Sequence, residues 1–223
     1  MPLWKRTMDV SGAALLLLAL APSLLLIATL IKMSSPGPAL LRQRRIGRKG
    51  KSFTMFKFRT MRPNADDGVH REHLTNIIAM DVPMTKLDVA QDPRVFAAGK
   101  IIRRCYLDEL PQLINVLRGD MSLVGPRPCL PYEARQLKLW QTARFRVLPG
   151  MTGLWQVSGK NKTTFTEMIR LDIAYADRLS FLLDARILFK TIPVILLEVM
   201  EKFLKRSLTP AGHVNTTPLR KNS

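Results

Sequence analysis

The chain has 223 residues, enough for one domain with a hydrophobic core. Its 35 lysines and arginines exceed its 17 aspartates and glutamates and give a formal net charge of +18, so its natural partners are anionic: nucleic acid, anionic lipid or nucleotide phosphates. Its two cysteines, Cys105 and Cys129, are too few for the disulfide framework of a small secreted protein and indicate a reduced, cytoplasmic setting.

The first predicted element is a membrane helix. No charged residue occurs between Val10 and Ile31, and this run of about 22 residues is long enough to cross a bilayer. A secretory signal is disfavoured, because the apolar region of such a signal is typically only ~7–15 residues long. Membrane attachment is therefore expected.

The way this helix lies in the membrane depends on Pro22 and on the flanking charges. Pro22 is near the middle of the run, where it removes a backbone hydrogen bond and kinks a helix. Both flanks are basic, whereas a spanning helix normally has one flank poorer in lysine and arginine. A re-entrant hairpin with both ends on the cytoplasmic side explains these features, and a simple spanning anchor with a tolerated proline is the alternative. The flanking cations are Lys5 and Arg6 before the run and Lys32, Arg42, Arg44, Arg45, Arg48, Lys49 and Lys51 after it.

Two short strands are predicted next, over residues 39–46 and 52–60. In the second strand two phenylalanines alternate with Lys57 and Arg59, so one face is apolar and the other is cationic. The pattern fits a strand that faces phosphate, and it equally fits a solvated strand beside lipid headgroups.

A helix is predicted around Asp67–Met80. His70 and His73 have helical spacing there, with Glu72 nearby, but a third well-placed ligand is missing. A solvated helix face is therefore preferred to a zinc site.

The next predicted helix follows an acidic pair, Asp108 and Glu109, which lies among basic residues. Asp108 suits the N-cap of this helix and Gly119 suits its end. Carboxylates beside cations and a helix N-terminus are expected to stay ionised at neutral pH. The pair could form a cap, or it could act as a nucleophile and metal ligand, and the pattern alone favours the cap. Apolar residues repeat along the helix at Leu110, Leu113, Ile114 and Leu117.

Two loops follow that are typical of binding sites. In Gly125–Pro128, prolines on both sides of Arg127 restrict the backbone and would present its planar fork to a phosphate or a base edge, although a rigid connector is the alternative. Leu148–Gly159 is a glycine-rich loop without the spacing of a standard phosphate loop.

The last part, residues 164–204, is predicted to be mostly helical. Thr191–Arg206 combines an apolar face with terminal basic residues, as interfacial helices do. Burial of that face against the domain core is the alternative. The tail from Ser207 is polar and rich in turn-forming residues.

These residues closely resemble the bacterial sugar transferase family, the monotopic phosphoglycosyl transferases that begin glycan assembly on polyprenyl phosphate. The resemblance runs from Lys5 to about Lys202, and the tail at Pro210–Thr216 also resembles that of small, single-domain members. The segments that carry it are KRTMDV before the apolar run, KFRTM (Lys57–Met61), LDELPQLINVLRGDMSLVGPRP (Leu107–Pro128) and PGMTGLWQVSGK (Pro149–Lys160).

The resemblance implies an α/β fold that is mostly helical, with a re-entrant N-terminal helix and amphipathic helices in the inner leaflet. It divides the chain into a re-entrant membrane helix (1–33), a cytoplasmic catalytic domain (34–206) and a polar tail (207–223). Small members often have Ser-Pro at the helix break, whereas this chain has Ala21-Pro22. A hydroxyl that could satisfy a freed carbonyl is therefore missing.

The activity that the resemblance implies is transfer of a sugar-1-phosphate from a UDP-sugar to polyprenyl (undecaprenyl) phosphate, with release of UMP. It would take place on the cytoplasmic face of the bacterial inner membrane, and nucleic acid would not be a partner. Asp108 would attack the sugar-linked phosphate and form an aspartyl phosphosugar, and Asp108 and Glu109 would hold Mg²⁺.

The resemblance also implies cationic contacts to the substrates. A membrane-tethered module for anionic lipid or nucleic acid is the rival interpretation, and it explains the charge but gives the acidic pair no role. The sugar, the pathway and the oligomeric state stay open. The implied phosphate-binding residues are Arg103, Lys57 and Arg59, and the nucleotide-contacting segment is Arg127 with Pro126 and Pro128.

Overall fold

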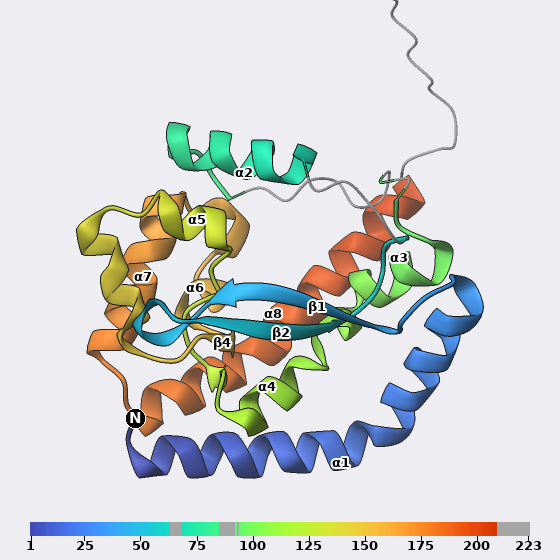
Figure 1. Ribbon diagram of the computed structural model, residues 1–223, viewed down its shortest axis with the longest axis horizontal. Helices are drawn as coiled ribbons and strands as arrows, with labels where there is room; N and C mark the ends of the chain where they lie inside the picture. Colours follow the sequence, from blue (N-terminus) through green and yellow to red (C-terminus); the bar gives the residue numbers. More distant parts are fainter. Residues whose placement is uncertain (63–67, 85–91, 93, 209–223) are drawn as a thin grey trace, which may run out of the picture.

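The computed structural model describes residues 1–62, 68–84, 92 and 94–208. The described chain is mostly helical, with small sheets, as predicted (Figure 1). The predicted helix around residues 67–80 is confirmed as α2, and residues 164–204 form most of two helices. The α-helices are α1 (Leu3–Ser34), α2 (Gly68–Met80), α3 (Ala97–Arg104), α4 (Gln112–Arg118), α5 (Pro131–Arg135), α6 (Leu154–Val157), α7 (Phe165–Asp177) and α8 (Phe181–Leu208).

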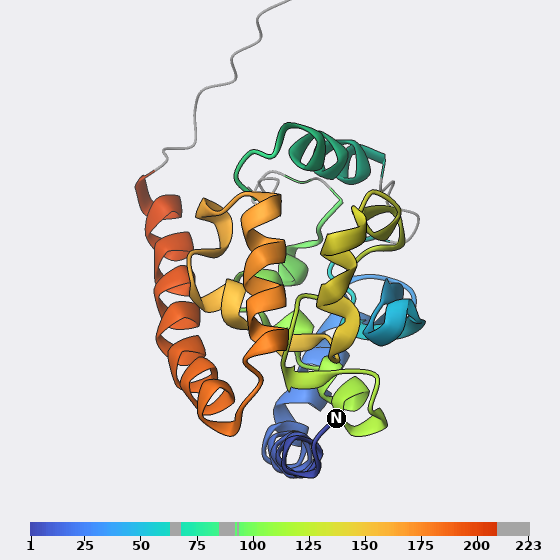
Figure 2. The same cartoon turned by 90° about the vertical axis from the view of Figure 1, so that its left-hand side faces the viewer.

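The two predicted strands are confirmed as an antiparallel hairpin of β1 (Leu40–Ile46) and β2 (Ser52–Phe58). A short turn, Arg48–Gly50, joins them, and it contains Lys49 and Gly50 at positive φ. In Figure 2 this hairpin lies on one side of the molecule, while α7 and α8 lie on the other.

A second, parallel sheet brings the two predicted binding loops together. It consists of β3 (Ser122–Val124) and β4 (Gly150–Thr152), which are too short to show a strand pattern. Just beyond β3, Gly125 donates its N–H to the carbonyl of Thr152 over 2.8 Å. A Cβ on Gly150 would lie 2.0 Å from the backbone nitrogen of Gly125, so only glycine allows the crossing.

Helix α1 is long, apolar and bent. It is continuous from Leu3 to Ser34 with Pro22 inside it, and Figure 1 shows that its second half turns away from the direction of its first half. The proline ring removes a hydrogen bond and crowds the preceding turn, which accounts for a bend there. Within the described part of the chain, α1 is the helix long and apolar enough to cross a membrane.

The start of α1 is fastened to the domain by a buried ionic network. Lys5 donates to Asp184 of α8 over 2.6 Å and to the Val124 carbonyl over 3.0 Å. Asp9 accepts hydrogen bonds from the hydroxyl of Ser122 and the N–H of Leu123. Breaking these contacts would leave buried charges unpaired, which is costly. The network therefore holds α1 and α8 together.

The basic residues before the apolar run therefore have a different role from the one predicted. Lys5 is only 3% exposed, and Arg6 donates to the carbonyls of Val116 and Leu117 at the end of α4. These cations bind protein groups, so they do not support the argument from basic flanks. The bend at Pro22 supports the hairpin geometry, and membrane insertion stays a prediction.

The apolar face of α8 is not buried against the core, which was the alternative for Thr191–Arg206. Large side chains along α8 are more than half exposed, and α1 presents a similar surface. The residues on α8 are Phe181, Leu182, Phe189, Ile192, Leu196, Leu197, Met200 and Leu204, and those on α1 include Leu15, Leu18, Leu25 and Leu26.

Candidate functional site

The acidic pair lies on a short 3-10 turn, Leu107–Glu109, between α3 and α4. Tyr106 precedes the turn with a left-handed backbone (φ 58°), an uncommon conformation for an aromatic residue. Asp108 is 8% exposed, whereas Glu109 is more accessible. From β2, Lys57 reaches Glu109, with 3.4 Å between Nζ and Oε1. The hairpin thus brings a cation to the pair, a contact that the strand pattern did not predict.

Asp108 does not cap the following helix, so that prediction was wrong. Helix α4 begins at Gln112, its flanking residue is Pro111, and no side chain caps it. Asp108 is instead the middle residue of the 3-10 turn, and the regular helix begins only four residues later. Gly119, with φ 83°, ends α4 as predicted. The carboxylate of Asp108 is consequently not used as a cap.

The pKa of Asp108 stays below 7, in line with the expectation that the acidic pair is ionised at neutral pH, but burial works against this. Burial raises its pKa to about 6, Lys57 and Arg103 oppose that rise, and Glu109 adds to it. Burial and the second carboxylate outweigh the cations and raise the pKa above its usual value, yet the carboxylate is still mostly ionised at neutral pH. Arg103, at the end of α3, is close enough to act on this pKa, so it belongs to the same site.

Arg59 was predicted to share the phosphate-facing side with Lys57, but it lies elsewhere. β2 ends at Phe58, so the alternation of the strand does not extend to Arg59. Its buried guanidinium donates to the carbonyls of Pro38 and Ser35 over 2.7 and 2.9 Å and lies over the ring of Phe96. Arg59 therefore holds the turn between α1 and β1, which does not fit a phosphate contact.

We expect Arg59→Met to lower the stability of the protein by about 1–3 kcal/mol, because buried carbonyls lose their donor. Its KM for substrate should stay within about twofold of the wild type. Lys57→Met should show the reverse pattern, with a higher KM and little change in stability. Thermal unfolding and steady-state kinetics measure both. A raised KM in stable Arg59→Met protein would restore the phosphate role.

Arg127 is paired inside the protein. Its guanidinium donates to both carboxylate oxygens of Glu133, over 2.9 and 3.1 Å. Burial alone would raise the pKa of Glu133, but Arg127 outweighs it and holds that pKa at about 2. The neighbouring carbonyls are also used, since Pro126 accepts from Gly150 and Pro128 accepts from Arg45. In this structure the segment Gly125–Pro128 acts as a rigid connector, and its contact with the nucleotide stays a prediction.

Beside the acidic pair lies a cluster that the sequence analysis missed. Lys160 donates to Glu198 over 2.8 Å and to the hydroxyl of Tyr106 over 3.3 Å. The Tyr106 hydroxyl donates to the same oxygen of Glu198. Lys202 lies over the Tyr106 ring, with Nζ 3.7 Å from its centroid. The sequence signal that could have indicated this cluster is the acidic and basic residues that interrupt the apolar pattern of α8.

This cluster is electrostatically part of the site. Burial raises the pKa of Tyr106, and the neighbouring charges of Glu198, Glu109 and Asp108 raise it further. Burial lowers the pKa of Lys202, and Asp108 and Glu109 are among the charges that oppose this. The candidate site thus combines two carboxylates with cations from β2, α3, α8 and the segment after the glycine-rich loop.

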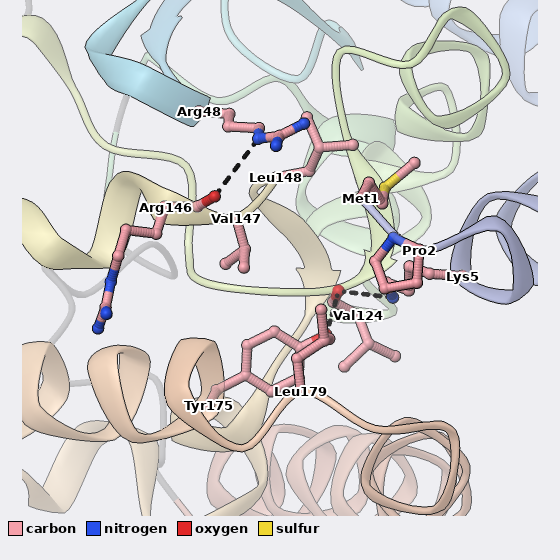
Figure 3. A pocket seen from close by; sticks show the side chains of 10 residues that line it. All are labelled: Met1, Pro2, Lys5, Arg48, Val124, Arg146, Val147, Leu148, Tyr175 and Leu179. Carbon is pink, nitrogen blue, oxygen red and sulfur yellow. Dashed lines mark hydrogen bonds between the residues drawn. The ribbon is translucent and has the colours of Figure 1, made fainter.

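A separate cavity of about 150 Å³ lies at the start of α1 (Figure 3). Lys5 and Tyr175 form part of its wall, and both bind the carbonyl of Val124, over 3.0 and 2.9 Å. Arg48 and Arg146 lie on its other side. Neither carboxylate of the acidic pair lines this cavity, so it is not part of the candidate site.

The acidic pair fits a magnesium ion better than zinc. Mg²⁺ is commonly bound by one or two carboxylates together with substrate phosphates. Asp108 and Glu109 supply that donor set, and the mutual repulsion that raises the pKa of Asp108 would be relieved by a cation. Among the described residues, no group of three His, Cys, Asp or Glu could hold a metal. The side chain of His70 lies outside the described part, so the disfavoured zinc site there is not tested.

Known proteins with similar sequences identify the family of this chain. The exopolysaccharide production protein ExoY of Sinorhizobium fredii is 42% identical over 196 residues, covering 86% of this chain and 85% of the relative. The UDP-glucose:undecaprenyl-phosphate glucose-1-phosphate transferase of Caulobacter vibrioides is 43% identical, covering 86% of this chain and 69% of the relative. The undecaprenyl-phosphate galactose phosphotransferase of Salmonella typhimurium is 39% identical, and the match covers 86% of this chain and 40% of the relative. The model of the family described as bacterial sugar transferase matches residues 1–198. The chain therefore belongs to the bacterial sugar transferase family.

Proposed function

We propose that this protein is a phosphoglycosyl transferase that moves a sugar-1-phosphate from a UDP-sugar to polyprenyl phosphate and releases UMP. The observation that carries the proposal is the Asp108–Glu109 pair, in which a largely buried carboxylate stands beside a second one that contacts Lys57. The charges of Lys57 and Arg103 both lower the pKa of Asp108. Relatives named for transfer of glucose-1-phosphate or galactose phosphate to undecaprenyl phosphate support the same chemistry.

In the first step, an oxygen of Asp108 attacks the phosphorus that carries the sugar. The bond from that phosphorus to the bridging oxygen breaks, UMP leaves with the bond electrons, and an aspartyl phosphosugar forms. In the second step, a phosphate oxygen of the polyprenyl acceptor attacks the same phosphorus. The carboxylate of Asp108 is released, and a polyprenyl diphosphate sugar results.

The other residues of the site would position the phosphates. Lys57 and Arg103 would bind phosphate oxygens and offset the negative charge that gathers around Asp108. Asp108 and Glu109 would hold Mg²⁺, which neutralises the diphosphate when it is bound. Tyr106 fixes the direction of the turn that carries both carboxylates.

The protein would work at the cytoplasmic face of the bacterial inner membrane. The acceptor has an apolar tail and an anionic head, so its phosphate lies at the interface. The exposed apolar faces of α1 and α8 would lie in the inner leaflet, and the excess of basic residues would bind anionic headgroups, at about 1 kcal/mol per residue. Such a position brings the active site to the plane of the lipid phosphate.

We expect the bend at Pro22 to return α1 to the side that it entered, so that the N-terminus is cytoplasmic. Protease added outside spheroplasts should then leave an N-terminal epitope tag intact. Pro22→Leu should favour a straight, spanning α1 and expose the tag, whereas Pro2→Leu, which lies before the apolar run, should not. Cleavage of the tag in the wild-type protein would show a spanning helix.

The proposed activity is tested by incubating the membrane-reconstituted protein with a panel of UDP-sugars, Mg²⁺ and undecaprenyl phosphate, and by measuring UMP. Release of UMP with at least one sugar, lost when Mg²⁺ is chelated, is the expected result. A module that only binds anionic lipid or nucleic acid would release UMP from none of them. The panel also identifies the sugar.

A further inference from the structure

Helix α8 brings a charged pair to the residue that precedes the catalytic turn. Glu198 and Lys202 are one helical turn apart, and both contact Tyr106, Glu198 at its hydroxyl and Lys202 at its ring face. Lys160 completes the cluster, because it binds Glu198 and lies 4.6 Å from the centroid of the same ring. Four side chains from three segments thus meet at Tyr106, which precedes Asp108 by two residues in the chain.

The carboxylate of Glu198 has the surroundings of a bound phosphate. One of its oxygens accepts from an ammonium group and from a phenol hydroxyl, and a second ammonium group lies on the ring of that phenol. Ammonium and hydroxyl donors bind carboxylate and phosphate oxygens in the same way. The hydrogen bond of Lys202 to the protein is weak, since Nζ is 3.5 Å from the carbonyl of Arg104, at the outer limit of a hydrogen bond.

The charges favour replacement of this carboxylate by a substrate group. Within the cluster Lys160 and Lys202 contribute two positive charges and Glu198 one negative charge, and Asp108 and Glu109 act on Lys202 from the neighbouring turn. A phosphate dianion would balance both ammonium groups and would bring a third acceptor oxygen.

We propose that Glu198 is an internal counter-ion that occupies a phosphate-binding position formed by Tyr106, Lys160 and Lys202, and that a substrate phosphate displaces it. This inference rests on the proposed function, which supplies two phosphate-bearing substrates, the UDP-sugar and the polyprenyl phosphate. Displacement needs only a change of the Glu198 side chain, which is partly exposed on α8. Glu198 then lowers the affinity of the empty site for phosphate and keeps Tyr106 in its left-handed conformation until substrate arrives.

The first test is binding of inorganic phosphate, which requires no turnover. Glu198→Gln removes the competing charge but keeps the shape, and we expect phosphate at constant ionic strength to raise its melting temperature more than that of the wild type. Glu201→Gln is the matched control, because Glu201 is an exposed acid on the same helix. In Glu198→Gln/Lys202→Met the gain should disappear. An equal response to phosphate in Glu198→Gln and wild-type protein overturns the proposal.

Kinetics then identify the phosphate. We expect the KM of Glu198→Gln to fall by roughly 3- to 10-fold for one of the two substrates, as for the loss of a competing ligand. A lower KM for the UDP-sugar places its diphosphate at Lys160, and a lower KM for undecaprenyl phosphate places the lipid head there. A purely structural Glu198 would instead give lower kcat and a lower melting temperature, which contradicts displacement. If the wild type releases no UMP at all, the proposed function fails, while the phosphate-binding result still stands on its own.

Discussion

Asp108→Asn is expected to lose at least about 10³-fold in UMP release, because asparagine cannot form the acyl phosphate and covalent catalysis ends. The same change should make the protein more stable at neutral pH. Asparagine has nearly the shape of aspartate but brings no charge into a buried place that already contains Glu109. Loss of activity with a gain in stability distinguishes a functional carboxylate from a structural one.

The gain in stability should depend on pH in a defined direction. Burial raises the pKa of Asp108 from 3.8 to about 6 in the folded protein. A carboxyl group with a raised folded pKa favours folding below its unfolded pKa, and that contribution is lost as the pH rises through the folded pKa. Asp108→Asn should therefore be more stable than the wild type by roughly 1–3 kcal/mol above pH 7 and equal to it below about pH 4.

Thermal unfolding of the detergent-solubilised protein across this pH range, with EDTA present, measures the effect. Asp177→Asn is the control, because Asp177 is an exposed carboxylate that pairs with Arg146. Adding Mg²⁺ should stabilise the wild type and not Asp108→Asn, which tests the metal site independently of turnover. Retained UMP release in Asp108→Asn would rule out its role as the nucleophile.

Lys5→Met is expected to destabilise the protein by about 3–5 kcal/mol, because it leaves Asp184 and Asp9 buried without their cation. Burial already raises the pKa of Asp184, and Lys5 opposes that rise. Without Lys5 the pKa of Asp184 should rise further, and at pH 5 this carboxylate can take up a proton. The loss of stability in Lys5→Met should therefore be greater at pH 8 than at pH 5.

Lys32→Met is the matched control, since Lys32 is an exposed lysine of the same helix, and its stability should be close to that of the wild type. The double variant Lys5→Met/Asp184→Asn should regain part of the loss, because it no longer buries the second unpaired charge. Chemical or thermal unfolding in lipid nanodiscs measures all three. A Lys5→Met protein as stable as Lys32→Met would show that the ion pair contributes little.

The sequence predicted the parts of this protein that depend on local patterns. The β1–β2 hairpin, α2 and the stop at Gly119 all follow from alternation, spacing or turn chemistry. The errors arose where contacts between distant segments decide the outcome. Arg59 and Lys5 look like surface cations until the backbone of another element surrounds them.

The site shows the same division. Asp108 and Glu109 could be found because they are adjacent in the sequence, but their environment could not. Whether a carboxylate has a low or a raised pKa depends on how deeply the fold buries it, and the sequence does not show that burial. Glu198 and Lys202 are about 90 residues away from the pair in the chain, and only the packing of α8 brings them to Tyr106.

The pairing of Lys5 with Asp184 also has a consequence for biosynthesis. The two residues are separated by 179 positions, so the first helix leaves the ribosome long before its partner on α8 is made. At about 5–20 residues per second, this interval lasts roughly 10–35 s. During that time Lys5 has no internal counter-ion on α8, and the apolar part of α1 is free to enter the lipid. The N-terminal helix can therefore reach its position before the rest of the protein closes on it, and α8, which is translated later, completes the ionic network.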